Sequence, residues 1–81
     1  MVHMKGEFTT QDLNLSATLL IKGFVLKQIN KTSEGKSTFV FTNDDELNKV
    51  IQDFWNNTLL VNPQELFQVL KVLKNRIYSS Y

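Results

Sequence analysis

The sequence predicts an α+β domain in which three amphipathic helices pack on a small antiparallel sheet. Apolar residues recur at helical spacing in three segments, each preceded by a residue that can cap a helix. Between the first two segments lie two runs rich in β-branched and aromatic residues, separated by a short turn that contains a glycine. Because a two-stranded hairpin is unstable alone, we expect the helices to cover one of its faces.

Length and composition indicate one globular domain. The chain has 81 residues, of which 42% are hydrophobic and 21% charged. We expect a tail over residues 1–7, unless a short strand lies near Glu7 and Phe8, and a single domain over residues 8–79. Apolar runs such as residues 19–21 are far shorter than the about 20 residues that cross a bilayer, so no membrane partner is expected. The absence of cysteine excludes disulfides and favours the cytoplasm.

The first helix is predicted over residues 10–22. Thr9 offers a hydroxyl cap, and Asp12 follows three residues later as in a capping box. Gly23 is placed as a glycine that ends a helix.

The hairpin is predicted from residues 24–32 and 38–42. The turn residues Ser33, Glu34 and Gly35 separate the two runs, and the glycine can adopt a positive φ. Alternation in the first run is imperfect, and strict alternation assigns Val25 and Ile29 to one face and Leu26 to the other.

The second helix is predicted over residues 44–56. Asn43 is the expected cap, and Glu46 would complete a capping box. An acidic cluster, Asp44, Asp45 and Glu46, lies in the first turn, where the helix dipole favours negative charge. Capping therefore explains the cluster better than a metal site does.

The third helix is predicted over residues 63–78. Asn62 is a side-chain cap, Pro63 occupies the first helical position and Glu65 the third. The preceding residues 59–61 are extended, either as a third strand or as a packed linker.

Several of these segments resemble a family of small uncharacterised proteins from bacteriophages and mobile elements. The resemblance rests on residues 8–13, 20–24, 53–55 and 61–67, and it extends over residues 8–79. Its motifs are caps, a helix-ending glycine and aromatic core positions. The resemblance implies a phage or mobile-element context inside a bacterial cell, and it carries no site residues.

No catalytic apparatus is apparent, so we expect a binding protein and no enzyme. The only histidine, His3, lies in the tail and there is no cysteine, so neither a base beside a nucleophile nor a structural zinc site is expected. Glycines at positions 6, 23 and 35 do not form a phosphate-binding loop. No cofactor or metal is expected.

Double-stranded DNA is the first candidate partner. One face of the third helix carries Gln64, Gln68, Lys71 and Asn75 at spacings of four, three and four, and Lys74 and Tyr78 border it. Glutamine and asparagine can pair with adenine, and lysine can reach guanine or phosphate. A second basic group lies in the hairpin: Lys27, Lys31 and Lys36. These lysines would flank a duplex like a wing, or they protect edge strands from aggregation. The alternatives for the helix face are an ordinary solvated surface and a contact with a partner protein.

A surplus of large apolar side chains suggests a further contact. The chain has more aromatic and aliphatic groups than one small core needs, and both hairpin faces look partly apolar. One face would then pair with a second copy in a homodimer. The leading hypothesis is a DNA-binding accessory or regulatory protein, and the alternative is a module that binds or inhibits a host protein.

Overall fold

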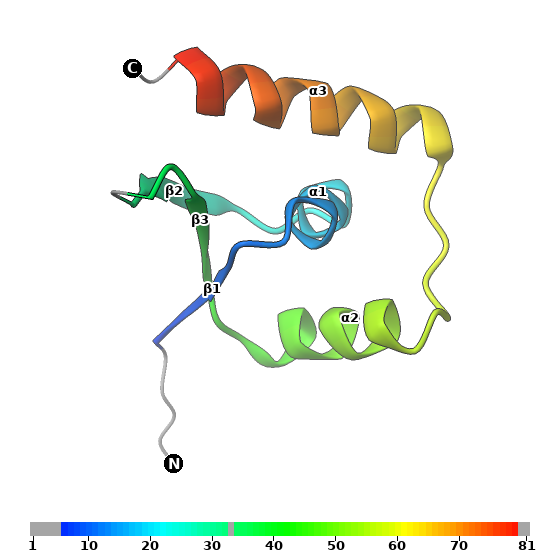
Figure 1. The fold of residues 1–81 in the computed structure, drawn as a ribbon. Helices are drawn as coiled ribbons and strands as arrows, with labels where there is room; N and C mark the ends of the chain where they lie inside the picture. Colours follow the sequence, from blue (N-terminus) through cyan, green and yellow to red (C-terminus); the bar gives the residue numbers. More distant parts are fainter. Residues whose placement is uncertain (1–5, 33, 80–81) are drawn as a thin grey trace.

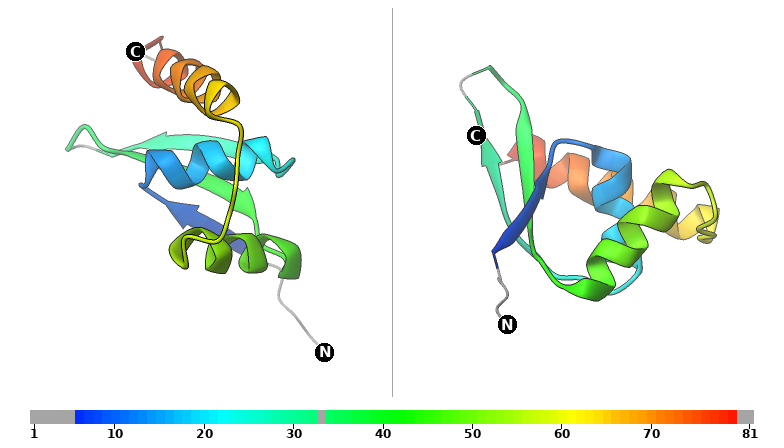
Figure 2. Two further views of the ribbon diagram at one scale, coloured as in Figure 1. Left: turned by 90° about the vertical axis from the view of Figure 1, so that its right-hand side faces the viewer. Right: turned by 90° about the horizontal axis from the view of Figure 1, so that it is seen from below.

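A computed structural model of the chain describes residues 6–32 and 34–79, and within them the predicted fold class is confirmed. The elements follow in the order β1 (Glu7–Thr10), α1 (Leu13–Ile21), β2 (Leu26–Lys31), β3 (Ser37–Thr42), α2 (Asp45–Trp55) and α3 (Pro63–Ser79). The three strands form an antiparallel sheet, and the three helices lie on one side of it (Figures 1 and 2).

The sheet contains the hairpin and one additional strand, in the order β1-β3-β2. Glu7, predicted to lie either in the tail or in a short strand, is the first residue of β1. Phe8 pairs with Phe41, and Thr10 pairs with Phe39. The central strand, β3, is therefore hydrogen-bonded on both sides, and the edge strands are β1 and β2.

The assignment of β2 residues to faces was wrong at Leu26 and Ile29. Leu26 pairs with Phe41 and Ile29 pairs with Phe39, so both side chains share the face that the helices cover. A bulge between Leu26 and Gln28 is the reason, because the extra residue, Lys27, shifts the alternation by one position.

The outer face of the sheet is mainly polar, more so than the predicted hairpin with two partly apolar faces. Most residues that pair on this side have hydroxyl, amide or carboxylate side chains: Glu7, Thr9, Gln28, Asn30, Thr38 and Thr42. Their one apolar neighbour, Val40, is only 1% exposed. Within the three strands this face therefore exposes little apolar surface, although Val25, directly before β2, is 72% exposed.

Helix α1 lies at the centre of the helical layer, with α3 on one side and α2 on the other (Figures 1 and 2). Its five residues 15–19 are all buried. The two polar members, Ser16 and Thr18, donate their hydroxyl hydrogens to the carbonyl oxygens of Asp12 and Asn14, both at 2.9 Å. Local hydrogen bonding of this kind satisfies the hydroxyl groups and allows their burial.

The N-terminal cap of α1 is Asp12, not Thr9. The backbone N–H of Leu15 donates to Asp12 Oδ1 at 3.0 Å. Thr9 is held in extended conformation by its pairing with Val40, so the helix begins later than predicted. The predicted end is confirmed, because Gly23 has a φ of 98° directly after the C-terminal cap.

Helix α2 is capped one residue later than predicted. The backbone N–H of Leu47 donates to Asp44 Oδ1 at 2.7 Å. Asn43 instead extends the sheet, since its backbone N–H donates to the carbonyl oxygen of Gly6 at 3.3 Å. Asp45 and Glu46 occupy the first turn, where their negative charges interact favourably with the helix dipole.

Helix α3 begins as predicted. Asn62 Oδ1 accepts hydrogen bonds from the backbone N–H groups of Gln64 at 2.8 Å and Glu65 at 3.2 Å. Residues 59–61 form no strand and belong to the linker between α2 and α3. Lys22 Nζ, at the end of α1, donates to the carbonyl oxygen of Leu60 at 3.3 Å and ties this linker to α1.

The core fills the space between the helices and the covered face of the sheet. Its fully buried apolar members come from α1, β3, α2 and α3: Leu15, Ala17, Leu19, Phe39, Phe41, Leu47 and Leu73. No helix in the described ranges is long and apolar enough to cross a membrane.

We predict that Leu73→Ala lowers the free energy of unfolding by about 2–5 kcal/mol, because it leaves a cavity between α3 and α1. Leu73 is completely buried, whereas the adjacent Val72 is 57% exposed. Val72→Ala is therefore the matched control, and it should change stability by no more than about 0.5 kcal/mol. Urea unfolding followed by circular dichroism measures both, and equal losses would contradict the packing described.

We also predict that Asp44→Ala lowers the free energy of unfolding by about 1 kcal/mol, because it removes the cap of α2. Asn43→Ala should have a smaller effect, since no described residue hydrogen-bonds to Asn43 Oδ1. The same urea titration compares the two variants. A larger loss for Asn43→Ala would show that the cap is Asn43.

Candidate functional site

The polar face of α3 that the sequence predicts as a binding surface is exposed in the structure. Leu73 lies in the core, and the partly buried residues of the same stripe pack against it: Leu66, Val69, Leu70 and Ile77. Gln64, Gln68, Lys71 and Asn75 lie on the opposite side of the helix and are exposed to solvent. The structure therefore brings these four predicted residues together on one face.

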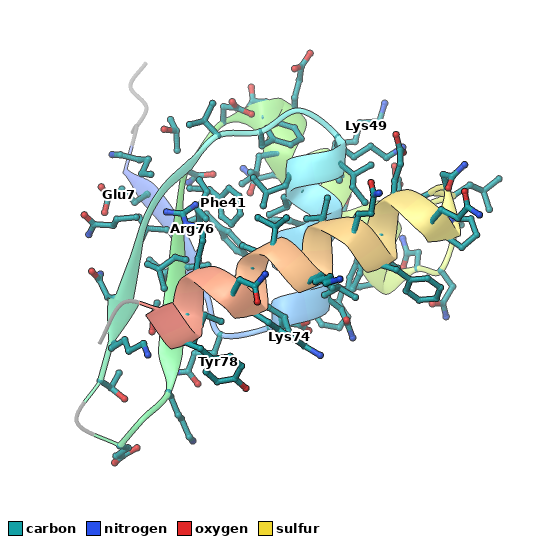
Figure 3. The ribbon with its side chains drawn as sticks, turned by 90° about the horizontal axis from the view of Figure 1, so that it is seen from above. Glu7, Phe41, Lys49, Lys74, Arg76 and Tyr78 are labelled. Carbon is teal, nitrogen blue, oxygen red and sulfur yellow. The ribbon has the colours of Figure 1, made fainter. Side chains whose placement is uncertain are left out.

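Next to this polar face, a flank of α3 combines aromatic and cationic side chains. Four residues at spacings of four, three and four make up this cationic–aromatic flank: Phe67, Lys71, Lys74 and Tyr78. At 3.6 residues per turn, they fall within an arc of about 60° around the helix axis. Lys74 and Tyr78 project from the same side of α3, and Arg76 projects from the other side (Figure 3).

The aromatic residues of the flank are unusually exposed for their size. Phe67 is 66% exposed and Tyr78 is 69% exposed, so most of each ring lies outside the core. Apolar groups of this size normally lie inside a domain, and exposed ones that gather together often mark an interaction surface.

The electrostatics of the flank are positive. Residues 66–79 contain Lys71, Lys74 and Arg76 and no acidic residue. Neither Lys71 nor Lys74 forms an ion pair with a residue in the described part of the chain. Both ammonium groups are exposed and available to an anionic ligand.

The three hairpin lysines do not form a single surface with α3. Lys27 Nζ forms an ion pair with Glu7 Oε2 at 2.7 Å, across β3 on the outer face of the sheet. Glu7 lies on the side of the sheet away from the helices (Figure 3). Lys31 pairs with Ser37 at the other end of the hairpin and is half-buried. The three lysines therefore do not form the single wing-like surface that was predicted.

Lys36 is the exception, because it lies close to the C-terminal end of α3. It lines a hollow of about 440 Å³ together with Gln11 of the β1–α1 loop and Tyr78 of α3. Glu34, which precedes it in the turn, is also exposed and partly offsets its charge. Lys36 extends the cationic–aromatic flank toward the turn, and the charge of the flank rests mainly on α3.

A separate cleft of about 560 Å³ lies between α1, the end of α2 and the start of α3. Its walls are mainly apolar and come from α2, the linker and α3: Phe54, Trp55, Leu59, Val61 and Leu66. The rings of Phe54 and Trp55 meet edge to face, with centroids 5.0 Å apart. Asn14, Thr18 and Asn57 supply its polar groups.

The described residues contain no group of three histidine, cysteine, aspartate or glutamate side chains arranged to hold a metal ion. Within the acidic cluster at the start of α2, the carboxylate of Asp44 is engaged by the backbone N–H of Leu47. The chemistry that the exposed groups offer is binding: ammonium groups for anions, amides for hydrogen bonds and aromatic rings for stacking.

The sequence predicted most of this surface but not that its rings are exposed. The spacing of Gln64, Gln68, Lys71 and Asn75 was sufficient to place them on one face. Tyr78 was placed beside this face together with Lys74, whereas Phe67 was assigned only to an apolar surplus, although its spacing from the lysines was visible in the sequence. The exposure of the two rings depends on how α3 packs against α1, which the helical period does not reveal.

Comparison with known proteins gives one match. A family model described as Domain of unknown function (DUF5659) matches residues 5–79. No curated protein and no solved structure matches the chain. The family match says nothing about bacteriophages or mobile elements, so that context stays a prediction. Because the match extends over nearly all of the fold described above, the chain belongs to the DUF5659 family.

Proposed function

We propose that this chain is a non-catalytic binding protein and that its ligand is DNA, held on the exposed side of α3. The observation that carries the proposal is the pair Lys71 and Lys74 on a helix whose residues 66–79 include no acid. Each ammonium group can neutralise a phosphate and release a counterion, which favours binding at low salt. The net charge of the whole chain is only +1, so the attraction would be local to this surface.

The amide side chains beside the lysines could supply contacts to bases. Gln64, Gln68 and Asn75 are exposed on the adjoining face of α3. Glutamine and asparagine present a donor and an acceptor together, which matches the edge of adenine in the major groove. The start of α3 adds little for an anion, because Glu65 lies in its first turn.

The resemblance to small bacteriophage and mobile-element proteins suggests a natural target. In that context the protein would be an accessory or regulatory factor that acts on the DNA of such an element inside a bacterial cell. This context supports the choice of DNA over other polyanions as the first ligand to test.

We predict that Lys71→Glu and Lys74→Glu each weaken DNA binding at low salt, because each replaces a phosphate-binding cation by an anion. The double variant K71E/K74E should abolish the binding. For the wild-type chain, about two phosphate contacts give a slope of about −1.8 on duplex DNA and about −1.4 on single strands, for the logarithm of the binding constant against the logarithm of salt concentration. A gel shift on mixed-sequence DNA, single-stranded and duplex, measures these effects.

Lys49→Glu is the matched control for the single variants. Lys49 is exposed on α2 and lies well away from Lys74 and Tyr78 (Figure 3), and its substitution changes the net charge by the same amount. Unchanged DNA binding by K71E/K74E would exclude the proposal, as would an equal loss for Lys49→Glu.

The apolar cleft supports a second candidate function, the capture of a host protein or of a second copy. Trp55 at its rim is 60% exposed, and Leu60 of the linker is 87% exposed. Tryptophan is enriched among the residues that contribute most to binding at protein interfaces. This candidate requires that the chain give no DNA shift at low salt and that Trp55→Ala abolish partner binding or dimerisation in analytical ultracentrifugation.

A further inference from the structure

We propose that the DNA which this surface prefers is an unpaired stretch, whose bases stack on Phe67 and Tyr78 while its phosphates contact Lys71 and Lys74. The inference rests on the proposed function and adds to it the form of the ligand. It arises from the one feature of the surface that duplex recognition does not use, the two exposed rings.

The rings and the cations occupy the same arc of α3. Phe67 and Tyr78 lie at the two ends of the cationic–aromatic flank, and the two lysines lie between them. At 1.5 Å per residue, the rings are about 16 Å apart along the helix axis. A strand that follows the flank would therefore meet an aromatic, two cations and a second aromatic in succession.

This order matches the way in which proteins hold single strands without regard to sequence. Such proteins combine a positively charged track for the backbone with aromatic side chains on which the bases stack. The charge complementarity is local to the flank, because Lys71 and Lys74 have no acidic neighbour among residues 66–79. The opposite side of α3, where Arg76 projects, offers the aliphatic Val72 and no aromatic ring.

A duplex would leave the rings without partners. Paired bases are stacked on one another and present only their edges in the grooves. Phe67 and Tyr78, which are 66% and 69% exposed, would then face the hydrated phosphate backbone. Phosphate groups offer no surface on which an aromatic ring can stack. The hollow shared by Tyr78 and Lys36 also gives room beside the second ring for a nucleotide.

The experiment measures fluorescence anisotropy of a labelled oligothymidine and of a labelled duplex of mixed sequence, with the full chain at low salt. We expect the oligothymidine to bind at least about tenfold more tightly than the duplex. Phe67→Ala and Tyr78→Ala should each weaken the oligothymidine complex by at least about fivefold, which is the low end of the range for a lost base–aromatic stack. Neither substitution should change the weaker duplex binding.

Conservative variants separate stacking from apolar contact. Phe67→Leu keeps an apolar side chain and should bind as weakly as Phe67→Ala, whereas Phe67→Trp and Tyr78→Phe keep a ring and should retain wild-type affinity. Val72→Ala is the matched control, since Val72 is exposed on the same helix outside the flank. Circular dichroism confirms that each variant is folded.

The outcomes distinguish this inference from the proposed function. Equal affinity for duplex and oligothymidine, or full affinity in Phe67→Leu and Tyr78→Ala, would overturn the inference and leave DNA binding intact. Absence of binding to both probes at low salt would overturn the proposed function and the inference with it.

Discussion

The burial of the middle of α1, residues 15–19, is the constraint on which the other elements depend. This helix has nine residues, and five consecutive ones, 15–19, are buried, so no single covering element would suffice. The sheet packs Phe39 and Phe41 into the same core as the buried residues of α1, and α2 and α3 lie on the two sides of α1. Because the two buried hydroxyl groups bond back to the helix itself, this burial leaves none of the side-chain polar groups of residues 15–19 without a partner.

The way in which α1 is covered determines which surfaces remain for function. α3 reaches the core through one apolar stripe that includes Leu73, so its outward face and one flank stay in solvent. The linker that leads to α3 is tied to α1 by the hydrogen bond from Lys22 to Leu60, and its residues Leu59 and Val61 line the apolar cleft. The outer face of the sheet is mainly polar and carries the ion pair between Lys27 and Glu7. Among these surfaces, only the flank of α3 combines rings with unpaired cations.

The fold was largely predictable from the sequence, and the errors in the prediction have local structural causes. The helical periods and the hairpin turn gave the element order, and the Asn62–Pro63 start of α3 was correct to the residue. Both misplaced caps lie where a strand runs directly into a helix: pairing keeps Thr9 and Asn43 extended, so the aspartate that follows becomes the cap. The bulge at Lys27 could not be predicted, because in the sequence one extra residue appears only as an imperfect alternation of apolar and polar side chains. The exposure of Phe67 depends on tertiary packing, which no local pattern encodes.

The central claim is that the chain works through the cationic–aromatic flank of α3, and an NMR titration tests it most directly. Uniformly ¹⁵N-labelled chain would be titrated with an unlabelled oligothymidine, and the amide shifts mapped on the fold. The account predicts that the largest shifts fall within residues 67–78, with smaller ones near Lys36. Shifts centred on the cleft residues 54–61, or on the outer face of the sheet, would contradict it.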